Sequence, residues 1–219
     1  MTTFYLIRHG ETDWNVSGRW QGHTDIPLND VGRAQAARLA ERLRDHGPRF
    51  DALYSSDLLR AWETAQFAGR AIGMQPQPMP ALREIDLGTW SGLTRAEIME
   101  RDLDTLAQVD AGVDLPRGGA ERFADLVARV SAAAEQLATK HHGQHVALVT
   151  HGGVVRALLQ HAAPDAHAWH AHIGNTSITI VVYNQQGWDV VSVNDMAHLE
   201  GSPQAPDLMS APPDDAQQA

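Results

Sequence analysis

Apolar positions near the start of the chain change from a continuous run to a helical period. The run Phe4–Ile7 is apolar and β-prone, so it predicts a short buried strand. From residue 29 onward, apolar side chains recur every three or four positions, which predicts a helix over residues 29–45. Asn29 is a suitable N-cap for this helix, and Gly47-Pro48 ends it. The chain therefore opens with a strand followed by a helix.

The same alternation continues through the rest of the chain. A second short strand is predicted over Asp51–Tyr54, and Asp57 is placed to cap a helix that runs through Arg70 and ends before Gly73. Strands that alternate with helices predict an α/β fold, a three-layer sandwich in which helices flank a mostly parallel central sheet. The later elements are a helix over 121–140, a strand Val146–Val149, a helix that opens at Gly152-Gly153, and a hairpin of Ile178–Tyr183 and Trp188–Val193.

Residues 74–120 lack this regularity. Prolines at positions 76, 78 and 80 interrupt the pattern, and Pro116–Gly119 forms a further break. A short helix is predicted over Thr94–Arg101. We therefore expect this segment to be an insertion or a lid.

The composition is that of a globular protein. Of 219 residues, 43% are apolar and 20% are charged, and the N-terminal apolar run is too short for a signal peptide or a membrane span. We expect a single domain over residues 1–201, located in the cytoplasm and without a membrane partner. Residues 202–219 offer little to bury and are expected to form a disordered tail.

Charge and cysteine content exclude several kinds of function. The net charge of −10 argues against a nucleic-acid partner. The lack of cysteine excludes disulfide scaffolds, thiolate zinc sites and every cysteine-nucleophile mechanism, including that of the cysteine-dependent phosphatases. A homodimer is compatible with the sequence, because homodimers are the commonest soluble assembly.

Two predicted strands each end in a histidine-glycine pair. The first strand runs into His9-Gly10 and the later one into His151-Gly152-Gly153. Ligands of open α/β sheets bind at the carboxyl ends of the parallel strands, so both histidines are expected in one place. The backbone N–H groups at the start of the helix that Gly152 opens form an anion site. The sequence therefore predicts an anion held between two imidazoles.

Charged residues near these pairs suggest phosphate as the anion. Arg8 precedes His9, and Arg60 lies near the start of the helix after the second strand. Guanidinium groups suit bidentate contact with phosphate oxygens. A carboxylic acid would supply the proton for a leaving alkoxide, and Glu84 is the candidate, with Asp86 as its rival.

These residues belong to a longer ordered series of motifs. The series includes Arg8-His9-Gly10-Glu11-Thr12-Asp13-Trp14-Asn15, Gly18-Arg19-Trp20-Gln21-Gly22, Ser55-Ser56-Asp57-Leu58-Leu59-Arg60-Ala61, Leu82-Arg83-Glu84, Thr150-His151-Gly152-Gly153, Asn175-Thr176-Ser177 and Asn194-Asp195-Met196-Ala197-His198-Leu199. It resembles the phosphatase branch of the histidine phosphatase superfamily, the phosphoglycerate mutase-like proteins. The resemblance covers nearly everything except the tail.

The resemblance implies metal-free, cofactor-free phosphoryl transfer in two steps. His9 would attack phosphorus and become a phosphohistidine that water then hydrolyses. Its arginine neighbours would favour the neutral imidazole that this attack needs. By the same resemblance Glu84 would protonate the leaving oxygen and later activate water. The residues that would hold the phosphoryl group are Arg8, Arg60 and His151, with Asn15, Gln21, Gly22 and Gly152 lining the pocket.

The charge of the predicted lid favours a phosphatase over a mutase. A mutase must retain a bisphosphate, yet residues 86–120 carry three arginines against seven acidic residues. The first interpretation is therefore a phosphomonoesterase that acts on a small phosphorylated metabolite. The alternatives are a phosphoglycerate mutase and a phosphatase of phosphohistidine proteins. The chain departs from the family around Glu121, where relatives usually show a second glycine and a serine.

Two further clusters have competing interpretations. Five residues have two interpretations, an apolar wall for an organic leaving group or packing alone. These residues are Trp14, Trp20, Leu87, Trp90 and Met99. The histidines between His167 and His172 have the spacing of metal ligands, but no carboxylate or cysteine motif accompanies them, so no metal site is expected.

Overall fold

The computed structural model describes residues 1–166 and 168–200 of the chain. Within them a six-stranded sheet has the order β3-β2-β4-β1-β5-β6. The strands are β1 (Thr2–Arg8), β2 (Ala52–Ser55), β3 (Gln77–Pro78), β4 (His145–Thr150), β5 (Ile178–Asn184) and β6 (Gly187–Asp195). The predicted tail over 202–219 lies outside the described residues.

The sheet is parallel over its first four strands and antiparallel at one edge. β1 and β2 both pair with β4 in parallel, and β2 pairs with β3 in the same sense. β5 runs antiparallel to β1 and forms the predicted hairpin with β6. The predicted fold class, an α/β sandwich with a mostly parallel sheet, is confirmed.

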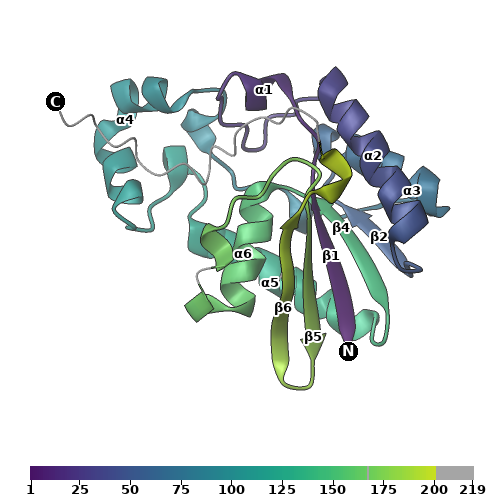
Figure 1. The fold of residues 1–219 in the computed structure, drawn as a ribbon. Helices are drawn as coiled ribbons and strands as arrows, with labels where there is room; N and C mark the ends of the chain where they lie inside the picture. The colour runs from purple at the N-terminus through teal and green to yellow at the C-terminus, as the bar shows by residue number, and fades with distance from the viewer. Residues whose placement is uncertain (167, 201–219) are drawn as a thin grey trace.

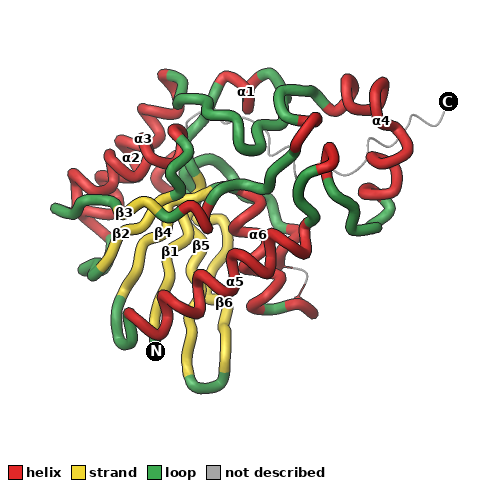
Figure 2. The backbone as a smooth tube through the Cα atoms, turned by 180° about the vertical axis from the view of Figure 1, so that it is seen from behind, coloured by secondary structure: helices red, strands yellow, loops and turns green. Residues whose placement is uncertain are grey.

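Helices cover both faces of this sheet (Figures 1 and 2). Side chains alternate along each strand, so Ile7 and Leu53 face α2 and α3, whereas Leu6 and Leu148 face α5 and α6. The helices of the described chain are α1 (Asp13–Val16), α2 (Asp30–His46), α3 (Leu59–Ile72), α4 (Arg95–Asp110), α5 (Phe123–Lys140) and α6 (Gly152–Ala162). No helix in residues 1–166 and 168–200 has the length and apolar character needed to cross a membrane.

The start of α3 differs from the prediction. Leu58, not Asp57, occupies the N-cap position, and it makes no side-chain capping bond. The Asp57 carboxylate instead accepts a hydrogen bond of 2.7 Å from Arg83 Nε, and this arginine directly precedes Glu84. The bidentate ion pair with Arg83 stabilises Asp57 more than a capping hydrogen bond to the helix would, because both the guanidinium and the carboxylate are charged.

α4 is longer than the predicted helix over Thr94–Arg101. Thr94 and Glu97 form a capping box at its start, and the helix continues beyond a kink at Asp102 as far as Asp110. The side chain of Leu106 is buried in the core and holds the second half in place. Figures 1 and 2 both show α4 beyond the carboxyl edge of the sheet, on the side away from α2 and α3.

Candidate active site

The loop that carries His9 is fixed by close packing against α2. Gly32, in the first turn of α2, approaches Glu11 so closely that a Cβ atom at Gly32 would lie 2.1 Å from the Glu11 carbonyl oxygen. The Glu11 N–H donates to Gln35 at 2.9 Å, and the Asn29 N–H donates to the Glu11 carbonyl at 3.0 Å. The segment after β1 therefore has one well-defined path, and His9 leaves the sheet at its carboxyl end.

The environment of His9 selects one tautomer of its imidazole. Nδ1 lies 2.7 Å from the carbonyl oxygen of Gly10, which can only accept, so Nδ1 carries the proton and donates. Nε2 then keeps its lone pair. Burial, Arg60 and Arg8 together hold the pKa of His9 well below its usual range. The ring is therefore neutral at pH 7, with a nucleophilic nitrogen.

His151 lies directly behind His9. The two ring centroids are 5.2 Å apart, and His151 Nε2 lies 2.8 Å from the Ser56 hydroxyl oxygen. The side chain is fully buried, and its Nδ1 has no hydrogen-bond partner among the described residues. Burial first, and Arg60 second, lower the pKa of His151 well below its usual range. A buried unsatisfied ring nitrogen beside the nucleophile is suited to a ligand oxygen.

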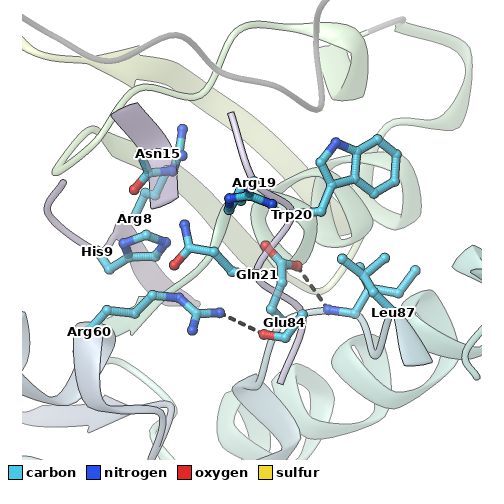
Figure 3. A pocket seen from close by; sticks show the side chains of 12 residues that line it. Arg8, His9, Asn15, Arg19, Trp20, Gln21, Arg60, Glu84 and Leu87 are labelled. Carbon is cyan, nitrogen blue, oxygen red and sulfur yellow. Dashed lines mark hydrogen bonds between the residues drawn. The ribbon is translucent and has the colours of Figure 1, made fainter. Parts of the chain in front are cut away.

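Arg60 brings a buried positive charge to the same place. Its guanidinium donates to the carbonyl oxygens of Thr24 at 2.9 Å and Gly22 at 2.8 Å, and the side chain is fully buried. Burial lowers the pKa of Arg60 to about 10, so it stays protonated at pH 7. Arg8 is also buried and donates to the carbonyl of Ile173. Both guanidinium groups line one pocket with His9 (Figure 3).

Glu84 reaches this pocket from the opposite side. Its carboxylate accepts hydrogen bonds from the N–H groups of Ile85 at 2.9 Å and Gly153 at 3.1 Å. A Cβ atom at Gly153 would lie 2.2 Å from Glu84 Oε1, so only glycine leaves room for this carboxylate. Gly153 lies in the first turn of α6, whose N-terminus favours a nearby negative charge. The close approach of α6 thus places Glu84 in the pocket.

An ion pair braces the chain on both sides of Glu84. The guanidinium of Arg129, on α5, donates to the carbonyls of Ala81 and Arg83, each at 2.9 Å, and pairs with the Glu121 carboxylate at 2.9 Å. Glu121 also accepts a hydrogen bond from the backbone N–H of Asp86 at 2.9 Å. The glutamate around which the sequence departs from its relatives therefore helps to hold the Glu84 loop.

Loss of this brace is expected to destabilise the protein. Arg129→Leu would leave the carbonyls of Ala81, Arg83 and Glu84 without this donor and would remove the guanidinium partner of Glu121, at a cost of about 1–3 kcal/mol in the free energy of unfolding. Urea unfolding measures this cost. The matched control is Arg95→Leu, because its ion pair with Asp110 lies at the surface and should be worth less than about 1 kcal/mol. Equal losses in the two variants would contradict the brace.

Comparison with known proteins identifies the family of the chain. A family model described as the histidine phosphatase superfamily (branch 1) matches residues 4–196. The chain belongs to the histidine phosphatase superfamily. The predicted family is confirmed.

Two plant proteins and one solved structure illustrate the relationship. The chain is 38% identical over 200 residues to phosphoglycerate mutase-like protein 4 of Arabidopsis thaliana, covering 89% of this chain and 86% of the relative. It is 37% identical over 203 residues to a metal-independent phosphoserine phosphatase of the same plant, covering 91% and 84%. A mutant phosphoserine phosphatase from Entamoeba histolytica, solved with phosphoserine, has a TM-score of 0.81 at 28% identity and covers 91% of this chain and 100% of its own.

The candidate residues of this histidine phosphatase lie together at one end of the sheet. Every one except His151, which lies behind His9, lines the pocket. Asn15 also closes a turn, because its Oδ1 accepts hydrogen bonds from the Thr12 N–H and hydroxyl. Gln21 Oε1 is buried without a partner among the described residues, and the Gly22 carbonyl holds Arg60. Gly152 lines the pocket, although a Cβ there would meet only ordinary contacts.

The other candidates occupy different places. The Asp86 carboxylate accepts from the Gly88 N–H and does not line the pocket. Of the five residues considered for an apolar wall, Trp20 and Leu87 line the pocket, and the other three do not. Trp90 is buried in the core, Met99 is exposed, and Trp14 packs on Gly92. Indole rings at these positions contribute packing instead of substrate contact.

Several functional residues were not predicted. Ser56 contacts His151, and the Gly153 N–H donates to the Glu84 carboxylate. Arg19 lines the pocket and forms an ion pair of 2.7 Å with Glu97. Ser56 and Gly153 stand within motifs of the resemblance, so their position was a usable signal. Arg19 is brought to the pocket by a bridge to Thr94, which no local pattern indicates.

The described residues hold no group of three or more metal-ligating side chains arranged around a point. His167, from the histidine cluster, lies outside the described residues, and His170 is exposed and stacks on Trp169. The pocket itself is lined by cations, one imidazole and one carboxylate, which suit an anion better than a metal ion.

Three histidines with lowered pKa values predict acid sensitivity. His9 and His151 are buried, and burial with nearby arginines lowers the pKa of His198 to about 4. The unfolded chain takes up protons below about pH 6.5 whereas these folded groups stay neutral, so stability falls as the pH drops. Each buried histidine contributes a slope of up to about 1.4 kcal/mol per pH unit. Urea unfolding between pH 7 and 5 should show the loss, and the curve of His198→Asn should be flatter. Parallel curves would contradict this assignment for His198.

Proposed function

We propose that this protein is a metal-independent phosphomonoesterase that acts on a small phosphorylated metabolite through a phosphohistidine on His9. The observation that carries the proposal is the neutral His9, with its Nδ1 proton held by Gly10 and its Nε2 lone pair left for attack. Family membership and the named phosphatase relatives support it.

In the first step His9 Nε2 attacks the phosphorus atom and the bond from phosphorus to the ester oxygen breaks. Glu84, in its acid form, gives its proton to the leaving oxygen. Arg8, Arg60, His151 and the N–H groups at the start of α6 hold the equatorial oxygens, whose charge is stabilised by preorganised donors. The products are an alcohol and phosphohistidine.

In the second step the Glu84 carboxylate takes a proton from water, and the oxygen attacks phosphorus. The bond from phosphorus to Nε2 breaks, which returns His9 to its neutral form and releases inorganic phosphate. Glu84 ends protonated, ready for the next ester. Its carboxylate is already oriented by Gly153 and Ile85, so it needs no rearrangement between the two roles.

The charges of the segment over 74–120 favour hydrolysis over mutase chemistry. Arg95 pairs with Asp110, and Arg117 lies 3.9 Å from Asp114, so these cations are already compensated by carboxylates. A cage for a bisphosphate would need uncompensated positive charge.

We propose that this segment is the lid of one domain over residues 1–201. Mutase activity stays the second candidate because several relatives are named phosphoglycerate mutase-like or probable phosphoglycerate mutase. Cytoplasmic location and homodimer formation stay predictions.

The deciding experiment follows inorganic phosphate and 2-phosphoglycerate together. The purified protein is mixed with EDTA and a panel of phosphoserine, 3-phosphoglycerate and sugar phosphates. Phosphate release that survives EDTA is the expected result. Isomerisation of 3-phosphoglycerate without release would favour the mutase, and release that stops in EDTA would contradict the metal-free mechanism.

A further inference from the structure

A second groove adjoins the active-site pocket and shares one side chain with it. Trp20 lines both the pocket of His9 and a groove between α4, α5 and the short helix η5 (Ala168–His170). The backbone of Trp20 is held in place, since its backbone N–H donates to the Leu93 carbonyl at 2.9 Å and its carbonyl accepts from the Gly92 N–H at 2.8 Å. Its indole packs edge to face on Trp90, with ring centroids 5.8 Å apart. The proposed mechanism does not use this groove.

Aromatic rings form the wall of the groove beyond Trp20. Phe123, at the start of α5, stacks on Trp169 with ring centroids 6.3 Å apart and planes 29° apart. The Arg117 guanidinium lies 5.6 Å from the Phe123 ring centroid and adds a third flat group. Phe123 is tied to the lid, because its N–H donates to Asp114 at 2.8 Å. His170 also lines the groove and lies against Trp169, with ring centroids 3.6 Å apart. The groove therefore has a wall of flat groups that pack on one another.

The charges that line the groove cancel. Two arginines, Arg95 and Arg117, face two carboxylates, Asp110 and Asp114, and each arginine lies near one of them. A second phosphate would gain little from such a lining, because every cation already has an anionic neighbour. A flat uncharged group would instead gain stacking on the rings without opposing charge.

We propose that this groove is a substrate subsite for a flat aromatic or heteroaromatic ring in the organic group of the phosphomonoester. The phosphoryl group lies between His9 and Arg60, the connecting part passes Leu87 and Trp20, and the ring lies against Phe123 and Trp169. This inference rests on the proposed phosphatase function and names the class of ester that the site prefers.

The test compares two esters with the same leaving oxygen. Adenosine 5′-monophosphate and ribose 5-phosphate both release a primary alcohol, and they differ in the heteroaromatic base. Stacking of a base on aromatic side chains predicts a preference of about tenfold in kcat/KM for the nucleotide. In Trp169→Ala this ratio should fall towards one, while kcat/KM for ribose 5-phosphate stays unchanged. Trp169→Phe should restore most of the ratio.

A tryptophan outside both cavities provides the matched control. Trp62, on α3, is partly exposed and lines neither cavity, so Trp62→Ala should keep the wild-type ratio. Equal kcat/KM values for the two esters in the wild type, or an unchanged ratio in Trp169→Ala, would overturn the subsite while leaving the phosphatase function intact. Lack of phosphate release from every phosphomonoester would overturn both.

Discussion

Replacement of His9 by alanine is expected to abolish phosphate release from every phosphomonoester. The variant loses the Nε2 lone pair that attacks phosphorus, and no other described residue offers a neutral nitrogen in the pocket with its proton fixed on the opposite side of the ring. Loss of a nucleophile lowers kcat by on the order of 10⁴–10⁶-fold in enzymes of this mechanistic type. The measurement is initial phosphate release at saturating substrate.

A covalent readout separates loss of the nucleophile from loss of folding. Rapid quenching of the wild-type protein with a radiolabelled ester should trap protein-bound phosphate that is labile in acid and stable in alkali, as expected for phosphohistidine. His9→Ala should show no such label while keeping its circular dichroism spectrum. His46→Ala, at the exposed end of α2, is the matched control and should be labelled normally. A label that persists in His9→Ala would assign the nucleophile to another residue.

Replacement of Glu84 by glutamine should slow hydrolysis according to the leaving group. Ile85 and Gly153 donate to different oxygens of the Glu84 carboxylate, so glutamine keeps only one of these two acceptors, and it has no proton to give to the leaving oxygen. Loss of general acid catalysis should lower the rate for an alkyl phosphate by about 10²–10⁴-fold. An aryl phosphate with an acidic phenol needs little protonation, so its first step should slow much less.

The matched control for Glu84 is its sequence rival. Asp86→Asn changes a carboxylate two residues away that lies outside the pocket, so the rates for both esters should stay near those of the wild type. Burst kinetics on the aryl ester distinguish formation of phosphohistidine from its hydrolysis, since Glu84→Gln should also slow the second step. Equal slowing of alkyl and aryl esters in the burst phase would show that Glu84 is not the proton donor.

Local patterns predicted most of the scaffold because they depend on neighbours in the chain. The strand at Phe4–Ile7 and the helix after Asn29 follow from periodicity and a capping residue. The structure extends the strand to Thr2–Arg8 and shifts the helix by one residue, to Asp30–His46. Errors arose where a distant partner intervened. Asp57 pairs with Arg83 instead of capping α3. For Trp90 the sequence left a pocket wall and core packing open, and the structure buries its side chain in the core.

The sequence by itself determined the fold class, the family and the set of candidate residues, because the motifs carry them at fixed positions along the chain. Only the tertiary structure decided which atoms face one another. The Nδ1 proton of His9 depends on the Gly10 carbonyl, and the place of Glu84 depends on a glycine of α6 and on Arg129 of α5. The groove at Phe123 and Trp169 forms where separate helices pack beside the segment over residues 74–120. Hydrogen bonds, burial and ring stacking depend on distances between remote segments, and spacing along a chain does not specify them.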